Sequence, residues 1–486
     1  MPEEKTRTFV AFIPTGPLPD EDGLLEVAAV RRCGERELDR FTELANPGEI
    51  PLAVQRLTGL DQARVASRPA PSEVMKNLLE FIGEDPAVAH GADELAAFLE
   101  ASHLHAPAQL ADSRRLARIV RPADSDFTLP AVAEAVGLES PEPHRAAELA
   151  RVTAGVWEQL LAELDALPGE ALVALSAVAS AAGDSLAGPL SDAANRKAQF
   201  ELSPDGRPRL EGMLSDHSEL FRRAQRYESP EPKNDPLDID KICAMFEPEG
   251  AIGRHLPGYE SRAEQVEMVR EVCEAFNTPY HLMFEAGTGT GKSMAYLLPA
   301  IAWARQNEDK VIVSTNTKNL QEQLYRKDLP FLSELLGGRF EAALLKGRRN
   351  YLCVRRFLRV VRYFERELSE ADEMAALLPL IAWAATTESG DLAECMGLML
   401  EQGAFALTPR VTSSGDECAG RACPHRNRCF IRRARTLAQL ADLVVANHAL
   451  VFAEVGLDQP YLPLNRSVIF DEAHNIEDVA TEALAV

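Results

Sequence analysis

The sequence lacks a hydrophobic run long enough to cross a membrane. Its longest apolar stretches, residues 171–182 and 374–385, reach about a dozen residues, whereas a spanning helix needs roughly 20. Acidic side chains stand near the start of the chain, where a secretory signal would carry basic ones. We therefore predict a protein without a membrane span that works in the cytoplasm.

The sequence also lacks the paired CxxC knuckles that are typical of zinc sites. Its eight cysteines, without a secretory signal, indicate a reducing compartment rather than a disulfide framework. Cys418, Cys423 and Cys429 are separated by four and five residues, and 64 residues separate them from Cys353 upstream. One distant and three nearby thiolates fit a [4Fe-4S] cluster better than zinc or unliganded thiols, which are the alternatives.

Basic charge is scarce overall and concentrated in two places. The net charge is -24, and residues 1–250 carry 25 Lys and Arg against 44 Asp and Glu. Residues 346–366 nevertheless hold eight basic side chains and one acid, and residues 421–435 hold six and none. Because both runs flank the predicted cluster ligands, contact with nucleic-acid phosphates is a better interpretation than a solvated surface. Tyr351, Phe357 and Phe430 either stack on unpaired bases there or pack in the core.

The order of apolar runs predicts a mixed α/β protein. Strand-like and helix-like runs alternate in the first domain, residues 1–167. Turn-rich and Pro-rich segments then indicate a connecting region and linker, residues 168–240. In residues 241–486 short apolar strands alternate with helices, which is typical of a parallel sheet covered on both faces.

The segment HLMFEAGTGTGKS, residues 281–293, predicts a phosphate-binding loop. We expect a buried strand, then a glycine-rich loop, then a helix beginning at Lys292. Backbone N–H groups at the helix N-terminus would hold a diphosphate, Lys292 would reach the β and γ phosphates, and Ser293 would bind Mg²⁺. A glycine-rich structural turn is the alternative, because Ala286 stands where the generic pattern begins with Gly.

Two carboxylates complete this prediction. Asp471 and Glu472 follow the apolar run RSVIF, and Asp471 stands 179 residues after Lys292. Asp471 would hold Mg²⁺ through water, and Glu472 would orient and deprotonate the attacking water. A solvated helix N-terminus is the alternative for this motif alone, but its occurrence with the loop favours a site for ATP and Mg²⁺.

Five motifs, in their order, resemble superfamily 2 DNA helicases of the DinG/XPD type: Tyr259-Glu260-x-Arg262-x-x-Gln265, EAGTGTGKS, STNTKNLQEQL, VVANHAL and DEAH. The resemblance implies a RecA-like helicase domain with an iron-sulfur insertion at about residues 346–435, and a role in DNA repair. It also implies that Gln265 reads the adenine edge, that residues 315–324 contact the nucleic-acid backbone, and that His474 couples the nucleotide state to the bound strand.

The predicted site residues follow from these motifs. Nucleotide-binding residues are Gln265, Gly287, Thr288, Gly289, Thr290, Gly291, Lys292 and Ser293. Catalytic residues are Lys292, Asp471, Glu472 and His474, with Ser293 and Asp471 also at Mg²⁺. The predicted cluster ligands are Cys353, Cys418, Cys423 and Cys429.

Residues 8–165 resemble DnaQ-like 3'-5' exonucleases, whose fold is RNase H-like, through runs such as FVAFIPTGPLP, LLEFIGEDPAVAHGADELAAFL and HRAAELARVTA. That family holds two Mg²⁺ ions with four carboxylates, but Ile13, Thr15, Leu95 and Leu149 stand at the matching positions. Hydrolysis is therefore not expected unless Asp93, Glu148 or Asp20 substitutes. His144 and Asp112 are expected to be structural remnants. We expect a degenerate domain used for docking, autoinhibition or nucleic-acid positioning, with a protein partner favoured.

Helicases of this resemblance need a second RecA-like domain that carries an arginine finger, and no such domain follows the DEAH motif in this sequence. The sequence therefore predicts an ATP-dependent DNA helicase that binds single-stranded or forked DNA and is not active alone. A 3'-5' exonuclease and a non-catalytic regulator that binds nucleic acid or protein are the alternatives.

Overall fold

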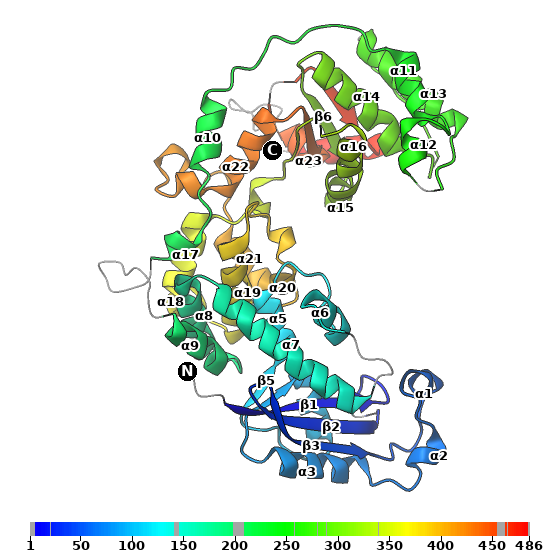
Figure 1. The fold of residues 1–486 in the computed structure, drawn as a ribbon. Coiled ribbons are helices and arrows are strands. Elements are labelled where there is room, and N and C mark those ends of the chain that lie inside the picture. The colour runs from blue at the N-terminus through cyan, green and yellow to red at the C-terminus, as the bar shows by residue number, and fades with distance from the viewer. Residues whose placement is uncertain are drawn as a thin grey trace. The chain divides into compact units, whose positions relative to one another are not determined.

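Two compact units make up the chain (Figure 1). A computed structural model describes residues 5–19, 21–139, 145–197, 209–256, 258–278, 280–287, 289–338, 340–453, 462–463 and 465–484. Unit 1 comprises Met1–Ser215 and Arg355–Val411, and unit 2 comprises Asp216–Val354 and Thr412–Val486. The predicted domain boundaries after residues 167 and 240 stay predictions.

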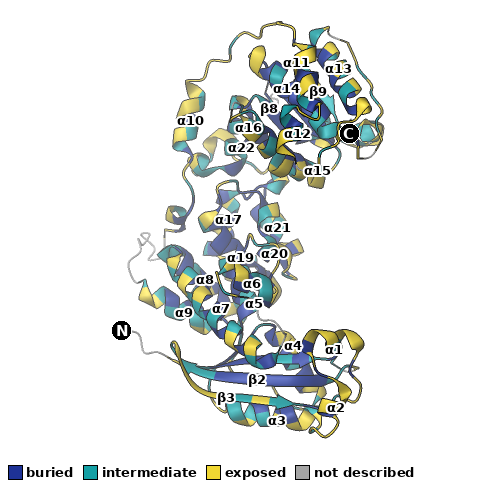
Figure 2. Cartoon of the chain, turned by 45° about the vertical axis from the view of Figure 1, so that its right-hand side comes forward, coloured by how far each residue is buried: buried dark blue, intermediate teal, exposed yellow. Residues whose placement is uncertain are grey.

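Unit 1 is built on a five-stranded mixed sheet of order β3-β2-β1-β4-β5. The first three strands are antiparallel and the last two run parallel to β1. Helices α3 and α4 pack on one face and α7 on the other. Figure 1 shows α3 and α7 on opposite sides of the sheet, and Figure 2 gives the burial of the strands between them. The strands are β1 (Thr6–Pro14), β2 (Leu24–Cys33), β3 (Arg36–Leu44), β4 (Ala87–Ala89) and β5 (Leu110–Asp112). The helices up to α7 are α1 (Leu52–Thr58), α2 (Gln62–Val65), α3 (Pro71–Ile82), α4 (Ala92–Ala101), α5 (Ser113–Val120), α6 (Leu129–Ala135) and α7 (Ala146–Ala166).

A helical part completes unit 1, and it joins two distant stretches of sequence. Helix α19 (Ala371–Thr386) packs against α8 (Gly169–Ala182) and α5. Residues 376–384 of α19 are all buried, so this helix is a core element of the unit. The other members are α9 (Ala187–Arg196), η1 (Leu210–Met213), α17 (Val354–Arg362), α18 (Phe364–Glu367), η5 (Leu392–Glu394), α20 (Met396–Met399) and α21 (Ala404–Val411).

None of the described helices has by itself the length and hydropathy of a membrane span. Only α7 and α8 taken together, with a bend of 120° between them, reach these values.

Unit 2 contains an all-parallel sheet of order β7-β8-β6-β9. Helices α13 and α14 pack together against this sheet, with Phe276 stacked on Trp303. The strands are β6 (Val311–Thr315), β7 (Ala342–Leu344), β8 (Leu443–Asn447) and β9 (Ser467–Phe470). The helices before β7 are α10 (Ser218–Gln225), α11 (Ile239–Cys243), η2 (Ala244–Phe246), α12 (Ala251–His255), α13 (Ala263–Asn277), α14 (Lys292–Gln306), α15 (Lys318–Gln323), a π-helical turn η3 (Leu324–Asp328) and α16 (Leu329–Leu335). Those after β7 are η4 (Arg348–Asn350), η6 (Gly420–Ala422), η7 (Arg426–Arg428), α22 (Phe430–Leu440), α23 (His448–Ala453), η8 (Ala473–Asn475) and α24 (Ile476–Leu484).

The prediction of a buried strand before the phosphate loop is wrong in part. Residues 281–287 are assigned to no strand of the sheet. Leu282 and Phe284 pack against the core, whereas Met283 between them is 94% exposed. The segment therefore shows the period-2 alternation of an extended chain with one covered face, and the apolar Met283 made it look buried on both faces.

Candidate functional site

The phosphate loop leads directly into α14, which begins at Lys292 as predicted. Gly289 and Gly291 have φ values of 79° and 77°, a region that favours glycine. The Thr290 hydroxyl donates to the Gly287 carbonyl over 2.9 Å and closes the turn. This conformation leaves the N-terminus of α14 beside the loop, where backbone N–H groups bind anions. Thr288 lies outside the described residues.

Side chains of the Tyr259 to Gln265 motif hold the loop from the side. The Gln265 amide donates to the Gly291 carbonyl over 3.0 Å, and its oxygen lies 2.8 Å from the Tyr259 hydroxyl. The Arg262 guanidinium donates to the Gly289 carbonyl. A side chain at Gly291 would overlap the Gln265 amide. The structure thus places Gln265 against the loop backbone, and its role toward adenine stays a prediction.

The DEAH motif meets the phosphate loop. Glu472 Oε1 lies 3.5 Å from Lys292 Nζ, and Glu472 Oε2 lies 3.5 Å from His474 Nδ1. Both the Lys292 and the Glu472 side chains are about one third exposed, with values of 29% and 33%. The residues predicted from two motifs 179 positions apart are therefore brought to one place, although their catalytic roles stay predictions.

Two residues that sequence reasoning missed border Asp471. The Tyr296 hydroxyl donates to Asp471 Oδ2 over 3.1 Å, and Tyr296 also contacts the Ser293 hydroxyl. Asp328, from the π-helical turn, is hydrogen-bonded to Ser293 and lies close enough to Asp471 for their negative charges to repel each other. Burial raises the pKa of both Asp471 and Asp328. The two carboxylates and the Ser293 hydroxyl are oxygen donors of the kind that Mg²⁺ prefers. A π-helical turn often marks a functional segment, but no local signal identifies one in the sequence.

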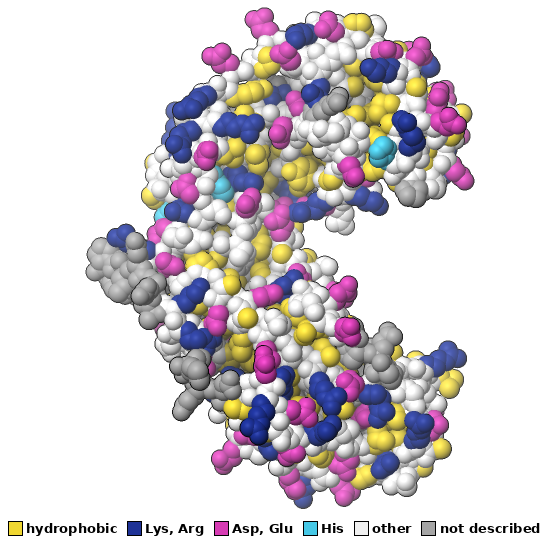
Figure 3. Space-filling model, in the orientation of Figure 1, with side chains coloured by type: hydrophobic (Ala, Val, Ile, Leu, Met, Phe, Trp, Pro, Cys, Tyr) yellow, Lys and Arg dark blue, Asp and Glu magenta, His cyan; other side chains and the backbone are white. Residues whose placement is uncertain are grey.

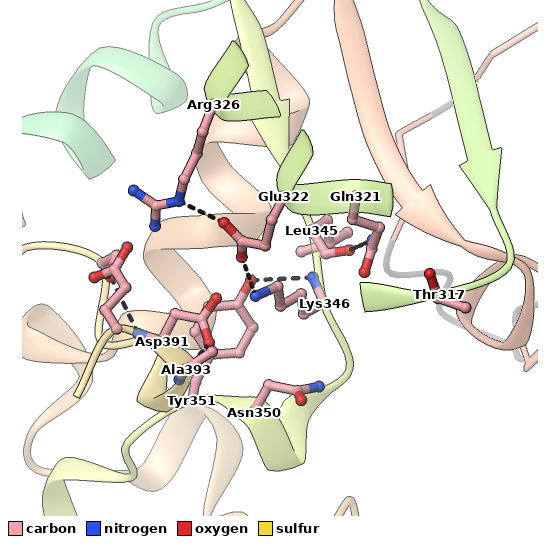
Figure 4. A network of polar contacts seen from close by, with 12 residues as sticks. Thr317, Gln321, Glu322, Arg326, Leu345, Lys346, Asn350, Tyr351, Asp391 and Ala393 are labelled. Atoms are coloured by element: carbon pink, nitrogen blue, oxygen red, sulfur yellow. Dashed lines mark hydrogen bonds and ion pairs between the residues drawn. The ribbon is translucent and has the colours of Figure 1, made fainter. Parts of the chain in front are cut away.

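The segment expected to contact nucleic acid is linked to the start of the first basic run (Figure 4). Thr317 caps α15 by accepting from Leu320 N–H over 3.3 Å. Glu322, on the same helix, pairs with both Arg326 and Lys346. The Lys346 side chain is only 2% exposed, and its backbone N–H donates to the Tyr351 hydroxyl over 3.0 Å. A partly buried ion pair therefore joins α15 to the chain that leads to Cys353.

The four predicted cluster ligands lie close enough to interact, and all four belong to unit 2. Burial raises the pKa of the Cys429 thiol, and the neighbouring thiols Cys353, Cys418 and Cys423 raise it further. Gly420 N–H donates to Cys418 Sγ over 3.4 Å. Within the described ranges no three His, Cys, Asp or Glu side chains are arranged to hold a single metal ion. The assignment of these four thiols to a [4Fe-4S] cluster therefore stays a prediction.

Most of the first basic run lies in unit 1, whereas the second lies in unit 2. Arg356 donates to the carbonyls of Pro409 and Arg410, and Arg359 pairs with Glu367, all within unit 1. The run 421–435 stays in unit 2, and Figure 3 shows basic side chains over α10 and α22. Tyr351, Phe357 and Phe430 are 5%, 0% and 0% exposed. These three aromatics therefore pack in the core instead of presenting faces to bases.

An ion pair lies beside Ile13, one of the positions at which the exonuclease resemblance implies a carboxylate. Glu26 lies opposite Ile13 in the β1–β2 pairing and is fully buried. It accepts from Arg145 Nη2 and Nε over 2.6 and 3.0 Å, and from Ala146 N–H over 3.0 Å. Its charge is thus neutralised by a guanidinium, which would repel Mg²⁺.

The other exonuclease positions carry apolar or engaged side chains. Leu95 is fully buried, and Thr15 accepts from Gly23 N–H over 2.8 Å. Asp112 caps α5 and accepts from Gly91 and Ala92 N–H, which agrees with a structural role. Of the possible substitutes, Asp93 is exposed and Glu148 pairs with Arg151 at 2.7 Å. Asp20 and His144 lie outside the described residues.

Comparison with known proteins gives two family matches and several relatives. Residues 14–157 match the Exonuclease family, and residues 264–356 match the DEAD/DEAH box helicase family. The 3'-5' exonuclease DinG of Bacillus subtilis is 30% identical over 97% of this chain and 50% of its own length. The ATP-dependent DNA helicase YoaA of Haemophilus influenzae is 37% identical over 50% of this chain and 37% of its own.

A third relative also matches about half of this chain. The ATP-dependent helicase DinG of Mycobacterium tuberculosis is 41% identical over 47% of this chain and 36% of its own length. The chain thus spans half or less of the length of these curated relatives. It is a homologue of the DinG/YoaA-type ATP-dependent helicases, with an N-terminal segment of the exonuclease family followed by a segment of the DEAD/DEAH box helicase family.

Proposed function

We propose that the chain is the ATP-binding and DNA-binding part of an ATP-dependent DNA helicase. The observation that carries this proposal is the meeting of Lys292 and Glu472 at 3.5 Å beside the N-terminus of α14. A glycine-rich turn alone would not require an acid 180 positions away to face its lysine. Loop, helix terminus, lysine and acids together supply what triphosphate and Mg²⁺ need.

Each residue of this site has a defined task in the proposal. The loop amides and Lys292 would hold the phosphates, Ser293 and Asp471 would hold Mg²⁺, and Glu472 would orient the attacking water. Mg²⁺, when bound, neutralises charge on the phosphates. The Tyr296 hydroxyl, which donates to Asp471 Oδ2 over 3.1 Å, would fix the direction of this carboxylate. His474 would couple this site to the bound strand.

Binding of a fluorescent ATP analogue in the presence of Mg²⁺ tests the proposal. Lys292→Ala should weaken binding by at least about tenfold, since a charge-assisted contact to phosphate is lost. Lys241→Ala, which removes an exposed lysine of the same unit, is the matched control and should bind like the unaltered chain. Equal binding by both variants would remove the basis for a nucleotide site.

We also propose that Cys353, Cys418, Cys423 and Cys429 bind a [4Fe-4S] cluster. Their mutual influence on the Cys429 thiol supports this ligand set. The backbone N–H of His217 donates to the Asn427 carbonyl over 2.9 Å, and its ring packs on Phe430, which holds the cysteine loop in place. A bound cluster would supply a cross-link between the two ends of the insertion.

Iron and sulfide analysis after anaerobic purification tests the ligand set. We expect about four irons per chain, and loss of most of them in Cys418→Ser. Cys395→Ser is the control. Because Cys395 is fully buried in unit 1, away from the four ligands in sequence, this variant should keep its iron. Stoichiometric zinc in place of iron would contradict the proposal.

Single-stranded or forked DNA is the proposed substrate. The run 421–435 carries six basic side chains and no acid, and it borders the cysteines within unit 2. Each phosphate contact should appear in the salt dependence of binding. Arg421→Ala removes an exposed arginine of this run, so the slope of log affinity against log salt should fall by about 0.7, the single-strand value per contact. Arg254→Ala, in exposed α12, should leave the slope unchanged.

A further inference from the structure

His448 occupies a place in the unit 2 sheet that no role described above explains. It follows β8 directly, begins α23 and is fully buried. Its Nδ1 lies 2.7 Å from Ser314 Oγ, and its ring packs on Phe470 with centroids 5.6 Å apart. Phe470 is the residue before Asp471, so His448 lies directly under the DEAH motif.

Ser314 ties the same motif to the neighbouring strand. It is fully buried near the end of β6, and its carbonyl accepts from Asp471 N–H over 2.8 Å. One residue thus contacts His448 through its hydroxyl and the DEAH backbone through its carbonyl. If the Ser314 hydroxyl donates to Nδ1, the remaining proton of the neutral imidazole is on Nε2.

In this tautomer Nε2 carries an N–H that can donate a hydrogen bond. It makes no hydrogen bond of normal geometry in the part of the chain that the structure describes, although it is buried. Burial lowers the pKa of His448, and the nearby backbone of Asp471 and Glu472 partly offsets this lowering, which places both residues beside the ring. Most buried side-chain polar atoms in proteins have a hydrogen-bond partner, so the unpaired Nε2 calls for an explanation.

The backbone beside this nitrogen is strained. Glu472 has φ 55° and ψ 46°, the left-handed region that a residue with a side chain rarely adopts. Such conformations persist only where the surroundings hold them, and they cluster at functional sites. A donor beneath the Asp471 and Glu472 carbonyls is suited to hold this one.

We propose that His448 is a positioning residue that donates from Nε2 to the DEAH backbone when Mg²⁺ and ATP are bound, with Ser314 fixing the ring orientation. This inference rests on the proposed nucleotide site. By holding the left-handed Glu472, His448 sets the direction of the Asp471 carboxylate toward Mg²⁺. Loss of His448 should therefore reduce the increase in ATP affinity that Mg²⁺ produces, and not the affinity in the absence of Mg²⁺.

The experiment compares affinities for a fluorescent ATP analogue with Mg²⁺ and with EDTA. In His448→Leu the gain in affinity due to Mg²⁺ should shrink by about fivefold to tenfold, the value of one lost hydrogen bond, while the affinity in EDTA stays within about twofold. His448→Gln, which keeps an N–H donor, should restore most of the gain. His255→Leu, at an exposed histidine of α12, is the matched control.

Ser314→Ala gives a second, smaller perturbation and should lower the Mg²⁺ gain in the same direction. If His448→Leu fails to fold, judged by its circular dichroism, the result of Ser314→Ala decides. An unchanged gain in the folded variants would overturn the inference. Absence of nucleotide binding by the unaltered chain would instead refute the proposed function, so the two failures are distinguishable.

Discussion

The Glu26–Arg145 ion pair of unit 1 permits a quantitative prediction. Glu26 is fully buried, the Arg145 side chain is 36% exposed, and two of the three donors to Glu26 are nitrogens of Arg145. Arg145→Leu removes both of them and leaves a buried carboxylate with only the Ala146 N–H. Because the carboxylate is stranded but solvent reaches the Arg145 side of the pair, we expect a loss of about 3 kcal/mol in local stability, the lower end of the range for a broken buried pair. Glu26→Met in addition to Arg145→Leu removes the stranded charge and should recover most of that loss.

Hydrogen exchange followed by mass spectrometry on peptides from β1 and β2 measures this effect. Whole-chain unfolding is unsuitable, because a chain with two units does not unfold in one step. Arg196→Leu is the matched control, since Arg196 pairs with Asp165 at 2.7 Å and both side chains are about 40% exposed. This exposed pair should contribute less than about 1 kcal/mol. The reasoning is refuted if Arg145→Leu costs no more than Arg196→Leu.

Three further predictions concern both units. Burial lowers the pKa of His90 to about 4, so between pH 6.5 and 4 the unfolded chain binds a proton at this residue and the folded chain does not. The hydrogen-exchange protection of β5 in the unaltered chain should therefore fall by about 2 kcal/mol between pH 7 and 5. The same pH change should leave the protection of β5 in His90→Gln unchanged. Lys346→Met should lower protection of α15 by about 1–2 kcal/mol, whereas exposed Lys327→Met should not. Labelled single strands should survive with Mg²⁺, and degradation abolished by Asp93→Ala or Glu148→Ala would instead establish a nuclease.

Much of unit 2 could be predicted from local patterns. Residues 311–315 form a fully buried strand, because four of these five residues are β-branched and polar segments bound the run. The start of α14 at Lys292 followed from glycines that permit the turn before it. These features depend on neighbours in sequence, so the sequence alone was sufficient to place them.

Contacts between distant segments could not be predicted in the same way. Tyr296 looks like any apolar residue of α14, and only the packing of β9 against β6 brings Asp471 to its hydroxyl. Asp328 and His448 likewise gain their positions from the tertiary fold. Helix α19, from the predicted insertion, belongs to unit 1 because its apolar surface packs on α8 and α5. The hydrophobic periodicity of a helix shows that it has an apolar face, but not which helix covers that face.

The contrast between the two units explains where chemistry is to be expected. At the end of β1 in unit 1, the buried acid Glu26 is neutralised by Arg145 and surrounded by core residues such as Ile13. At the ends of β6 and β9 in unit 2, Lys292 and Glu472 face each other at 3.5 Å while each remains about one third exposed. Because both side chains are separated and partly solvated, each can exchange its partner for phosphate or water. Arg145 is likewise 36% exposed, but Glu26 is fully buried, so releasing Glu26 from its donors would leave a buried charge at a large cost. Ligands of open parallel α/β sheets bind at the carboxyl ends of the strands, and Glu472, which follows β9, brings the Lys292–Glu472 pair to such an end in unit 2.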